Sequence, residues 1–311
     1  MRIHLVDDVG PSSPLEVVRR VGHPHILTSV LSAFRSGPKR FKVELQRLGA
    51  FDPSSHWILD SGLFSFMFSG HAQAPARTYE AFRDYTRRYL DMIDAAGFDG
   101  TIVEVDAQRL IGVDATKRLR EEFAPLGDRV MYVWHEPEGL DGLVELARAK
   151  SYIGLGLPEL RTISKRMGAK PNVLAENLLA RIHEATPGGP PRIHLLGGTS
   201  PPHYSTRMVY SCDSTTWLNA TKYGACPIFE EHGAKHLPVR SERFKAYVEN
   251  VFRLRPDLLD LLEPHAAGKR EYIRMRIASA FSYSRLQKWV DANITHVPMR
   301  GADLPGGPWR P

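Results

Sequence analysis

The chain lacks the features that mark secreted, membrane or disulfide-rich proteins. Only two of its 311 residues are cysteine, Cys212 and Cys226, so neither a disulfide framework nor a Cys₃His or Cys₄ zinc site can be built. No apolar run approaches the roughly 18 residues of a membrane-spanning helix. Asp7 and Asp8 also stand where a signal peptide needs its apolar stretch. The sequence therefore predicts a soluble protein of the cytoplasm that does not engage the membrane.

An excess of positive over negative charge is also nearly absent until the last quarter of the chain. Hydrophobic residues make up 42% and charged residues 24%, which are ordinary globular values that exclude a disordered or fibrous chain. The net charge is +6, and residues 239–311 hold 13 Lys/Arg against 8 Asp/Glu, a local net of +5. A basic region of this kind is typical of a polyanion-binding surface, although a solvated helical face has the same composition.

Short β-rich segments alternate with longer amphipathic segments, and no internal repeat is present. This alternation predicts a parallel sheet. Helices are expected over 79–96, 140–149 and 173–185, where apolar residues recur near helical spacing. Eight candidate strands favour an α/β fold of the closed (β/α)₈ barrel type over an open doubly wound sheet, with the second strand the weakest. The candidate strands are 3–6, 26–27, 56–60, 101–105, 130–134, 152–155, 192–196 and 208–212.

The pattern changes after Gly224. Residues 241–262 and 270–292 predict two long helices with no clear strand between them, which would be the last barrel helix plus an appended helical element. We therefore expect a barrel core over 1–240 and a basic helical element over 241–311 that packs on it. The tail over 301–311 is rich in glycine and proline and is expected to be irregular.

In a parallel barrel, the active site lies at the carboxyl ends of the strands. Polar residues or glycines follow six of the candidate strands, which predicts a site at this end of the barrel. These residues are Asp60, Ser61, Gly62, Glu104, Asp106, His135, Gly154, Gly156, Gly197, Gly198, Asp213 and, just beyond it, Trp217.

Asp60 and Asp213 stand out because each closes an apolar strand. Paired carboxylates are the usual equipment of glycosyl transfer, although each Asp could equally cap the helix that follows. Glu104 and Asp106 share one face of an extended strand, either toward the barrel interior or toward solvent. His135 has two interpretations, a donor to a ligand or a core contact.

Four segments resemble motifs of the tRNA-guanine transglycosylases. Residues 60–64 (DSGLF) resemble the family's Asp-Ser-Gly-Gly-Phe/Tyr motif, and 153–156 (IGLG) resemble its Ile-Gly-Gly-Leu segment. Residues 191–198 (PRIHLLGG) resemble its Pro-Arg-Tyr-Leu-Met-Gly-Val-Gly stretch, and 210–213 (YSCD) fall where it carries its Phe-Asp nucleophile. The order and rough spacing of all four agree over residues 57–216, about half of the chain.

The resemblance implies a (β/α)₈ barrel that exchanges guanine for a 7-deazaguanine base. Asp213 would be the nucleophile and Asp60 the general acid/base, with Phe64 and Leu196 on the two faces of the purine. Glu104 competes with Asp106 for the role of the base-reading carboxylate, and His135 stands where the family has Gln. The polar edge of the base would be met by Ser61, Asp106, His135, Gly154, Gly156 and Gly197, with Gly62 and Gly198 beside them and Trp217 either shaping the pocket or lying in the core.

Departures from the family's pattern point to DNA as the substrate. The tRNA enzymes carry a Cys-x-Cys-x-x-Cys zinc site after the nucleophile strand, whereas residues 223–227 here are YGACP. Loss of zinc, Leu63 in place of the second glycine and the Ser-Thr-Thr-Trp after Asp213 resemble the DpdA-type branch. That branch puts 7-deazaguanines into DNA and occurs in bacteria and phages. The resemblance implies no cofactor, a 7-deazaguanine co-substrate and helper proteins as possible partners.

A guanine in duplex DNA must be flipped out to reach a barrel mouth. Basic and aromatic residues interleave over 269–289, which predicts a backbone-contacting element or an amphipathic helix that packs its aromatics on the barrel. The expected contacts are Lys269, Arg270, Arg274 and Arg276. Three alternatives remain: a zinc-less tRNA-guanine transglycosylase, a non-catalytic barrel that binds nucleic acid, and an unrelated barrel enzyme.

Overall fold

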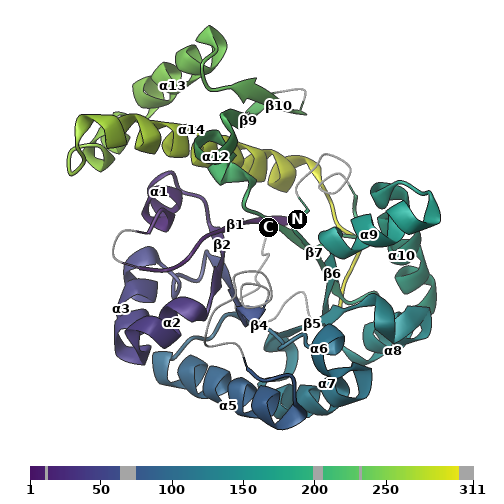
Figure 1. Ribbon diagram of the computed structural model, residues 1–311. Coiled ribbons are helices and arrows are strands. Elements are labelled where there is room, and N and C mark those ends of the chain that lie inside the picture. Colours follow the sequence, from purple (N-terminus) through teal and green to yellow (C-terminus); the bar gives the residue numbers. More distant parts are fainter. Residues whose placement is uncertain (11–12, 64–74, 199–205, 231–232, 301–311) are drawn as a thin grey trace.

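The structure, a computed structural model, describes residues 1–10, 13–63, 75–198, 206–230 and 233–300. Eight parallel strands close into a barrel in the order of the sequence, which confirms the predicted (β/α)₈ fold (Figure 1). The barrel strands are β1 (Arg2–Val6), β2 (His25–Ser29), β3 (His56–Asp60), β4 (Thr101–Val103), β5 (Val130–Trp134), β6 (Tyr152–Gly156), β7 (Arg192–Leu196) and β8 (Ser211–Ser214).

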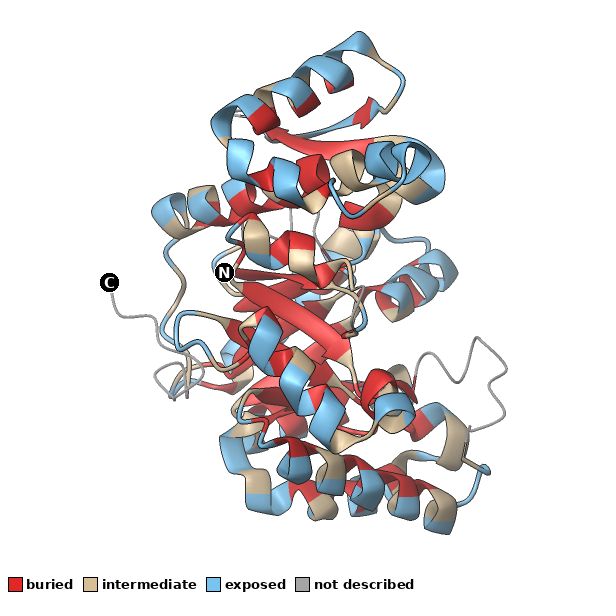
Figure 2. Cartoon of the chain, turned by 90° about the vertical axis from the view of Figure 1, so that its left-hand side faces the viewer, coloured by how far each residue is buried: buried red, intermediate tan, exposed pale blue. Residues whose placement is uncertain are grey.

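Helices surround the barrel and turn their polar faces to solvent, so that the strands at the centre are buried (Figure 2). The helix α5 begins where Thr78 Oγ1 accepts from the Ala81 N–H at 3.2 Å, and it ends at Gly97 in the left-handed conformation. The surrounding helices are α1 (Leu15–Arg20), α2 (Leu31–Ser36), α3 (Pro38–Leu48), α5 (Tyr79–Ala96), α6 (Gln108–Ile111), α7 (Val113–Arg120), α8 (Gly139–Ala149), α9 (Leu157–Met167) and α10 (Pro171–Ala185), with 3₁₀ turns η1 (Glu121–Arg129) and η2 (Glu136–Glu138).

Side chains alternate along each strand between the helix layer and the barrel interior. The interior changes character from the start of the strands to their carboxyl ends. Near the start lie Arg2, Tyr152 and Arg192, followed by the histidines His4, His25, His56 and His194. Above them an apolar cluster is formed by Leu27, Ile58, Val103, Met131 and Val133, with Val6 and Leu196 packed against it.

The eighth predicted strand is displaced toward the carboxyl end. It was expected over 208–212, but β8 pairs with β1 through Ser214, so that Asp213 lies opposite His4. Backbone pairing therefore continues past the apolar residues and holds Asp213 within the strand. The fourth strand, in contrast, ends at Val103, which leaves Glu104 and Asp106 beyond regular structure.

After β8 the chain makes an excursion before it returns to the barrel. Its elements are η3 (Thr216–Leu218), α12 (Asn219–Tyr223), β9 (Ala225–Glu230), β10 (Gly233–Pro238), α13 (Glu242–Leu254), η4 (Pro256–Leu261) and α14 (Ala267–Asn293). The antiparallel β9–β10 hairpin was not predicted; it lies beside the barrel and packs on α14, where the Phe229 and Trp289 rings are 5.7 Å apart (Figure 1). The helix predicted over 241–262 is divided because Pro256 disfavours helical geometry at Arg255.

The helix α14 covers β1 and takes the place of the eighth barrel helix. Gln287 accepts from the Ile3 N–H at 2.7 Å and donates to the Met1 carbonyl at 2.8 Å. The N-terminal half of α14 lies near the carboxyl end of β1. There the positive charge of Arg276 lowers the pKa of Asp7, against the larger effect of burial, which raises it. Within the described residues, no helix is both long and apolar enough to span a membrane.

Candidate active site at the mouth of the barrel

Asp60 ends β3 at the mouth of the barrel. Its Oδ1 accepts from the Gly62 N–H at 2.7 Å. Gly62 has a φ of +77°, and a Cβ there would lie 2.6 Å from Leu31 Cγ, so any other residue would be strained in this turn. Burial and the charges of Asp106 and Asp213 raise the pKa of Asp60 to about 7. Asp60 can therefore both hold and release a proton at neutral pH.

Asp213 presents its carboxylate to the same mouth from β8. Its side chain is 12% exposed, and Oδ1 accepts from the Gly197 N–H at 2.8 Å and lies 3.1 Å from His194 Nε2. Gly197 has a φ of +75°, which turns its N–H toward the carboxylate. Within the described part of the chain, no protein group bonds Oδ2. The structure thus brings Asp60 and Asp213 together, with one oxygen of Asp213 held and the other open.

Asp106, His135 and Glu159 form an ionic cluster on another side of the mouth. His135 Nε2 lies 3.1 Å from Asp106, and Nδ1 lies 2.5 Å from Glu159. Burial opposes a charge on His135, but the hydrogen bonds and charges of Asp106 and Glu159 outweigh it and raise the pKa of His135 to about 10. His135 is therefore an imidazolium at neutral pH, and both of its nitrogens are engaged. It orients Asp106 instead of presenting a free donor to a ligand.

Glu104 lies away from this cluster, in a buried ion pair. Its side chain is 1% exposed, and its oxygens accept from Arg120 at 2.8 and 2.9 Å and from the Val133 N–H at 2.8 Å. Arg120 also donates to Glu138 at 2.8 Å. Both oxygens of Glu104 are occupied, so of these two carboxylates the structure leaves Asp106, and not Glu104, at the mouth.

We expect Arg120→Met to lower the free energy of unfolding by about 3–5 kcal/mol, because it leaves Glu104 and Glu138 buried without their cation. Lys117→Met on the same helix is the control, since Lys117 forms an exposed pair with Glu145 worth less than about 1 kcal/mol. Urea denaturation followed by circular dichroism measures both. Equal stability of the two variants would contradict the structural role of the pair.

The floor of the mouth is apolar. Ile58 and Val133 precede Asp60 and His135 by two residues on inward positions, so they lie directly beneath them. A Cβ on Gly154 would come within 3.3 Å of Leu196 and Val133, so the absence of a side chain there keeps the floor open. Gly156 has room for a Cβ, 3.8 Å from that of Glu159. This floor suits the face of a flat, weakly polar ring.

The remaining predicted site residues are buried or lie outside the described residues. Trp217 is fully buried behind the mouth and donates its indole N–H to the Val6 carbonyl at 3.1 Å, which is a core position. Ser61 is fully buried, and its hydroxyl has no partner among the described residues. Gly198 is buried next to Gly197. Phe64 lies outside the described residues.

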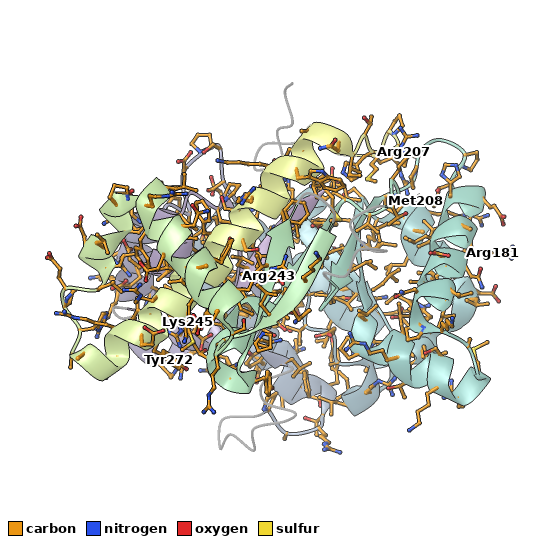
Figure 3. All side chains as sticks on the ribbon, turned by 90° about the horizontal axis from the view of Figure 1, so that it is seen from above. Arg181, Arg207, Met208, Arg243, Lys245 and Tyr272 are labelled. Carbon is orange, nitrogen blue, oxygen red and sulfur yellow. The ribbon has the colours of Figure 1, made fainter. Side chains whose placement is uncertain are left out.

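The four predicted nucleic-acid residues on α14 do not share one environment. Arg276 stacks on Tyr272 at 4.6 Å, and its charge and that of Lys222 reach Asp7 at the mouth. Arg274 instead pairs with Glu249 of α13, and Arg270 donates to the His265 carbonyl at 2.8 Å. Lys269 is exposed in the first turn of α14. Figure 3 places Tyr272 of this helix and Arg181 of α10 at opposite sides of the molecule.

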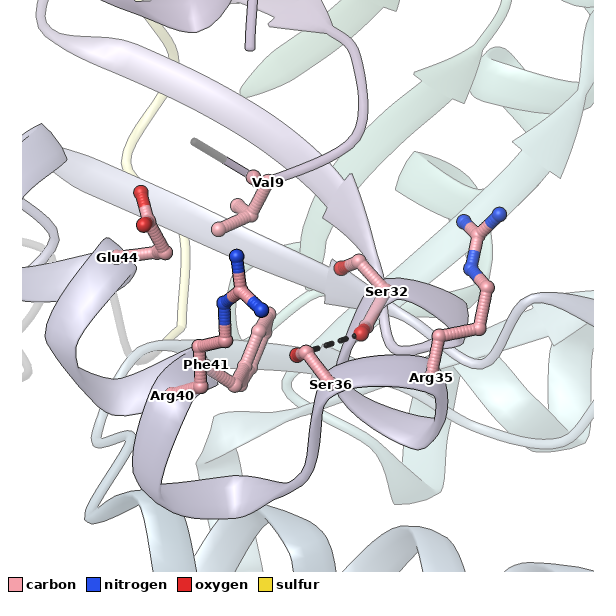
Figure 4. A pocket seen from close by; sticks show the side chains of 8 residues that line it. Val9, Ser32, Arg35, Ser36, Arg40, Phe41 and Glu44 are labelled. Carbon is pink, nitrogen blue, oxygen red and sulfur yellow. Dashed lines mark hydrogen bonds between the residues drawn. The ribbon is translucent and has the colours of Figure 1, made fainter. Parts of the chain in front are cut away.

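A second basic feature lies beside the mouth, where the loop after β1 meets α2 and α3. An open cavity of about 180 Å³ is lined there by Ser32, Arg35, Ser36, Arg40 and Phe41, among others. The guanidinium of Arg40 points into the hollow toward Val9 (Figure 4). Arg35 pairs with Asp8 at 3.2 Å, at the surface. Ser32 and Ser36 already donate their hydroxyl hydrogens to backbone carbonyls, and Glu44 adds a carboxylate to the lining. Arg40 is therefore the cationic donor that the cavity offers to a phosphate.

The histidines below the floor were not predicted from the sequence. His4 Nε2 lies 2.8 Å from His56 Nδ1, and the rings of His4 and His194 are 5.6 Å apart. The available signal was parity: each histidine is two residues from another inward residue of its strand, as His194 is from Leu196. Among the described residues, no three His, Cys, Asp or Glu side chains converge on a point that could hold a metal ion.

No protein-family model matches the chain, and no curated protein sequence matches it either.

Proposed function

We propose that the protein is a DNA-guanine transglycosylase, which exchanges guanine in DNA for a 7-deazaguanine base. The observation that carries the proposal is the pair of carboxylates at one barrel mouth, in different surroundings. Asp60 has a pKa of about 7, and Asp213 is held through Oδ1 by Gly197 and His194. Paired carboxylates of this kind serve as proton carrier and nucleophile in retaining glycosyl transfer. Guanine is proposed as the exchanged base because of the motif resemblance described above.

The two carboxylates divide the reaction between them. Asp213 attacks C1′ of the nucleotide, the C1′–N9 bond breaks, and its electron pair leaves on guanine, which Asp60 protonates. The result is a covalent glycosyl-enzyme. Asp60 then takes the N9 proton of the incoming 7-deazaguanine, whose N9 attacks C1′ and expels Asp213. Two inversions give net retention, and the pKa of Asp60 near 7 suits both proton transfers.

The cluster of Asp106, His135 and Glu159 suits recognition of the base edge. Guanine and 7-deazaguanine share two neighbouring donors, the ring N1–H and the exocyclic amine, and a carboxylate accepts from both. Asp106 is the half-buried carboxylate at the mouth that the His135 imidazolium orients. The open floor at Gly154 and Leu196 would lie against the face of the ring. The same contacts thus serve the departing and the incoming base.

Flipping a guanine out of a duplex costs roughly a few kcal/mol, which contacts to the flanking backbone must offset. Arg276 and Lys222 at one part of the mouth and Arg40 in the cavity beside the mouth are suited to phosphates. We propose that these groups hold the strand on either side of the flipped nucleotide.

Base exchange in vitro tests the proposal. The purified protein is incubated with labelled 7-cyano- or 7-aminomethyl-7-deazaguanine and either duplex DNA or bulk tRNA, and the nucleosides are analysed after digestion. Label in deoxynucleosides is the expected result. Label in tRNA alone would replace DNA by tRNA as the substrate. Label in neither, with a folded protein that binds DNA, would favour a barrel that only binds nucleic acid.

The double variant Arg40→Gln/Arg276→Gln is expected to weaken binding to DNA of any sequence and to lower the slope of log Kd against log salt by about 2, one for each lost phosphate contact. Arg181→Gln is the control, because Arg181 is exposed on α10 at the far side of the molecule. Fluorescence anisotropy of a labelled duplex measures the slope. If the double variant keeps the wild-type slope, the DNA strand runs elsewhere on the protein.

A further inference from the structure

A chain of buried hydrogen bonds runs from Asp213 toward the start of the barrel strands. Asp213 Oδ1 lies 3.1 Å from His194 Nε2, and His194 Nδ1 lies 2.7 Å from Ser211 Oγ. Ser211 Oγ is in turn 2.6 Å from the hydroxyl of Tyr152. Tyr152, His194 and Ser211 are all fully buried, so the chain is closed to solvent. Its one end near solvent is the carboxylate at the mouth.

The direction of each bond follows from its acceptor end. An ionised carboxylate has no proton to give, so His194 Nε2 carries the hydrogen and donates to Asp213. In the tautomer that carries only this hydrogen, Nδ1 is an acceptor and the hydroxyl of Ser211 donates to it. Ser211 Oγ accepts in turn from Tyr152, whose phenol burial keeps protonated by raising its pKa. Every donor in the chain therefore points toward Asp213.

These hydrogen-bonded side chains are not needed to fill the barrel interior. On β5 the equivalent inward positions are Met131 and Val133, which pack without any polar atom to satisfy. Burying an imidazole and two hydroxyls costs free energy unless each finds a partner. Other groups around His194 do not compete for its nitrogens, because His4 bonds His56 and the Cys212 carbonyl instead. The one group that the chain serves is the carboxylate of Asp213.

We propose that His194, backed by Ser211 and Tyr152, is a positioning residue that holds Oδ1 of Asp213 so that Oδ2 is the atom that attacks C1′. The inference rests on the proposed function for the attack itself. The two bonds to Oδ1, from His194 and Gly197, fix the plane of the carboxylate and leave the lone pairs of Oδ2 directed at the mouth. The polarised donor chain also stabilises the carboxylate when it departs in the second half of the reaction.

Two substitutions at one position separate the hydrogen bond from the packing. His194→Phe keeps the ring and removes the donor, whereas the amide nitrogen of His194→Gln reaches the place of Nε2. With a guanine-containing duplex and no incoming base, formation of the covalent protein–DNA species is followed in a single turnover. The rate is expected to fall on the order of 10–100-fold in His194→Phe and to stay within about tenfold in His194→Gln. DNA affinity should not change in either variant.

Equal rates in wild type and His194→Phe would overturn the inference while leaving the proposed function intact. No covalent species in the wild type would overturn the proposed function instead. Ser211→Ala is a second test. Loss of the Ser211 donor removes the preference of His194 for the Nε2–H tautomer, so the rate of covalent species formation is expected to fall to a value between those of wild type and His194→Phe.

The direction of the chain is testable without any activity. Nitrogen-15 spectra of the labelled wild-type protein, with His194→Gln used to assign the ring, are expected to show His194 as the neutral Nε2–H tautomer. Asp213→Leu removes the acceptor and should change the tautomer signal of His194 while the signals of exposed histidines stay unchanged. An Nδ1–H tautomer in the wild type would reverse the chain and overturn the inference.

Discussion

Asp213→Asn is expected to abolish base exchange, with covalent species formation reduced at least about 1,000-fold. The amide oxygen can still accept from Gly197 and His194, so the position of the side chain is kept, but no anionic oxygen remains to attack C1′. The stability of the variant should be close to that of the wild type. The measurement is the amount of label in deoxynucleosides together with the amount of protein cross-linked to DNA.

Asp91→Asn is the matched control, because Asp91 is exposed on α5 and faces solvent, away from the mouth. Its exchange rate should equal that of the wild type. Any exchange by Asp213→Asn above about one part in a hundred would remove Asp213 as the nucleophile. A loss of exchange in both variants would point to damage during preparation and not to the carboxylate.

Acid is expected to unfold the protein well above the usual range, near pH 5. Burial lowers the pKa of His4, His23, His25 and His56, so each stays neutral in the folded barrel. Above pH 6.5, the pKa of a histidine in the unfolded chain, these side chains are neutral in both states and the free energy of unfolding does not change. Below pH 6.5 the histidines of the unfolded chain bind protons, whereas those in the folded barrel stay neutral, so stability falls as pH falls. Between pH 6.5 and 5 each histidine costs at most about 2 kcal/mol.

Four such histidines together exceed half of a typical folding free energy of roughly 5–15 kcal/mol. Asp60 acts in the opposite direction, because its raised pKa favours the folded state as pH falls from about 7, and it offsets about one histidine. Urea titrations at a series of pH values measure the slope of stability against pH. His25→Leu, which removes a buried ring whose Nδ1 has no partner among the described residues, should flatten that slope by about 1 kcal/mol per pH unit.

His183→Leu is the control for this titration, since His183 is exposed on α10 and lies outside the buried histidine cluster. Its slope should match the wild type. A wild-type stability that is flat between pH 7 and 5 would mean that the interior histidines take up protons in the folded barrel.

The alternating strands and helices of the barrel could be predicted from the sequence, and the hairpin that follows them could not. The helix over 79–96 carries its own signals, a capping Thr78 and a terminating Gly97, and it was predicted with its observed bounds. The β9–β10 hairpin was missed because Pro227 interrupts the first strand and the pattern of alternation is short. Such a strand is stabilised by its packing on α14, which local sequence does not show.

The candidate site divides in the same way. Asp60 and Asp213 were found because each ends an apolar run, whereas Glu104 and Asp106 were expected to act alike because they are two residues apart. The early end of β4 at Val103 breaks that equivalence, and Arg120 from α7 takes Glu104 into the core. His194 was missed because its role depends on the register that sets it beside Ser211, a contact across strands that spacing along the chain does not encode.

The contact between Gln287 and β1 has a consequence for how the protein is made. It joins residues 284 positions apart, and β1 also needs β8 as its neighbour. During synthesis β1 therefore lacks the cover of α14 and keeps one unpaired edge until β8 and α14 have been made. Such long-range closure slows folding and leaves apolar strand surface open to aggregation. We expect nascent chains to depend on chaperones, and chains stopped before α14 to accumulate as insoluble material.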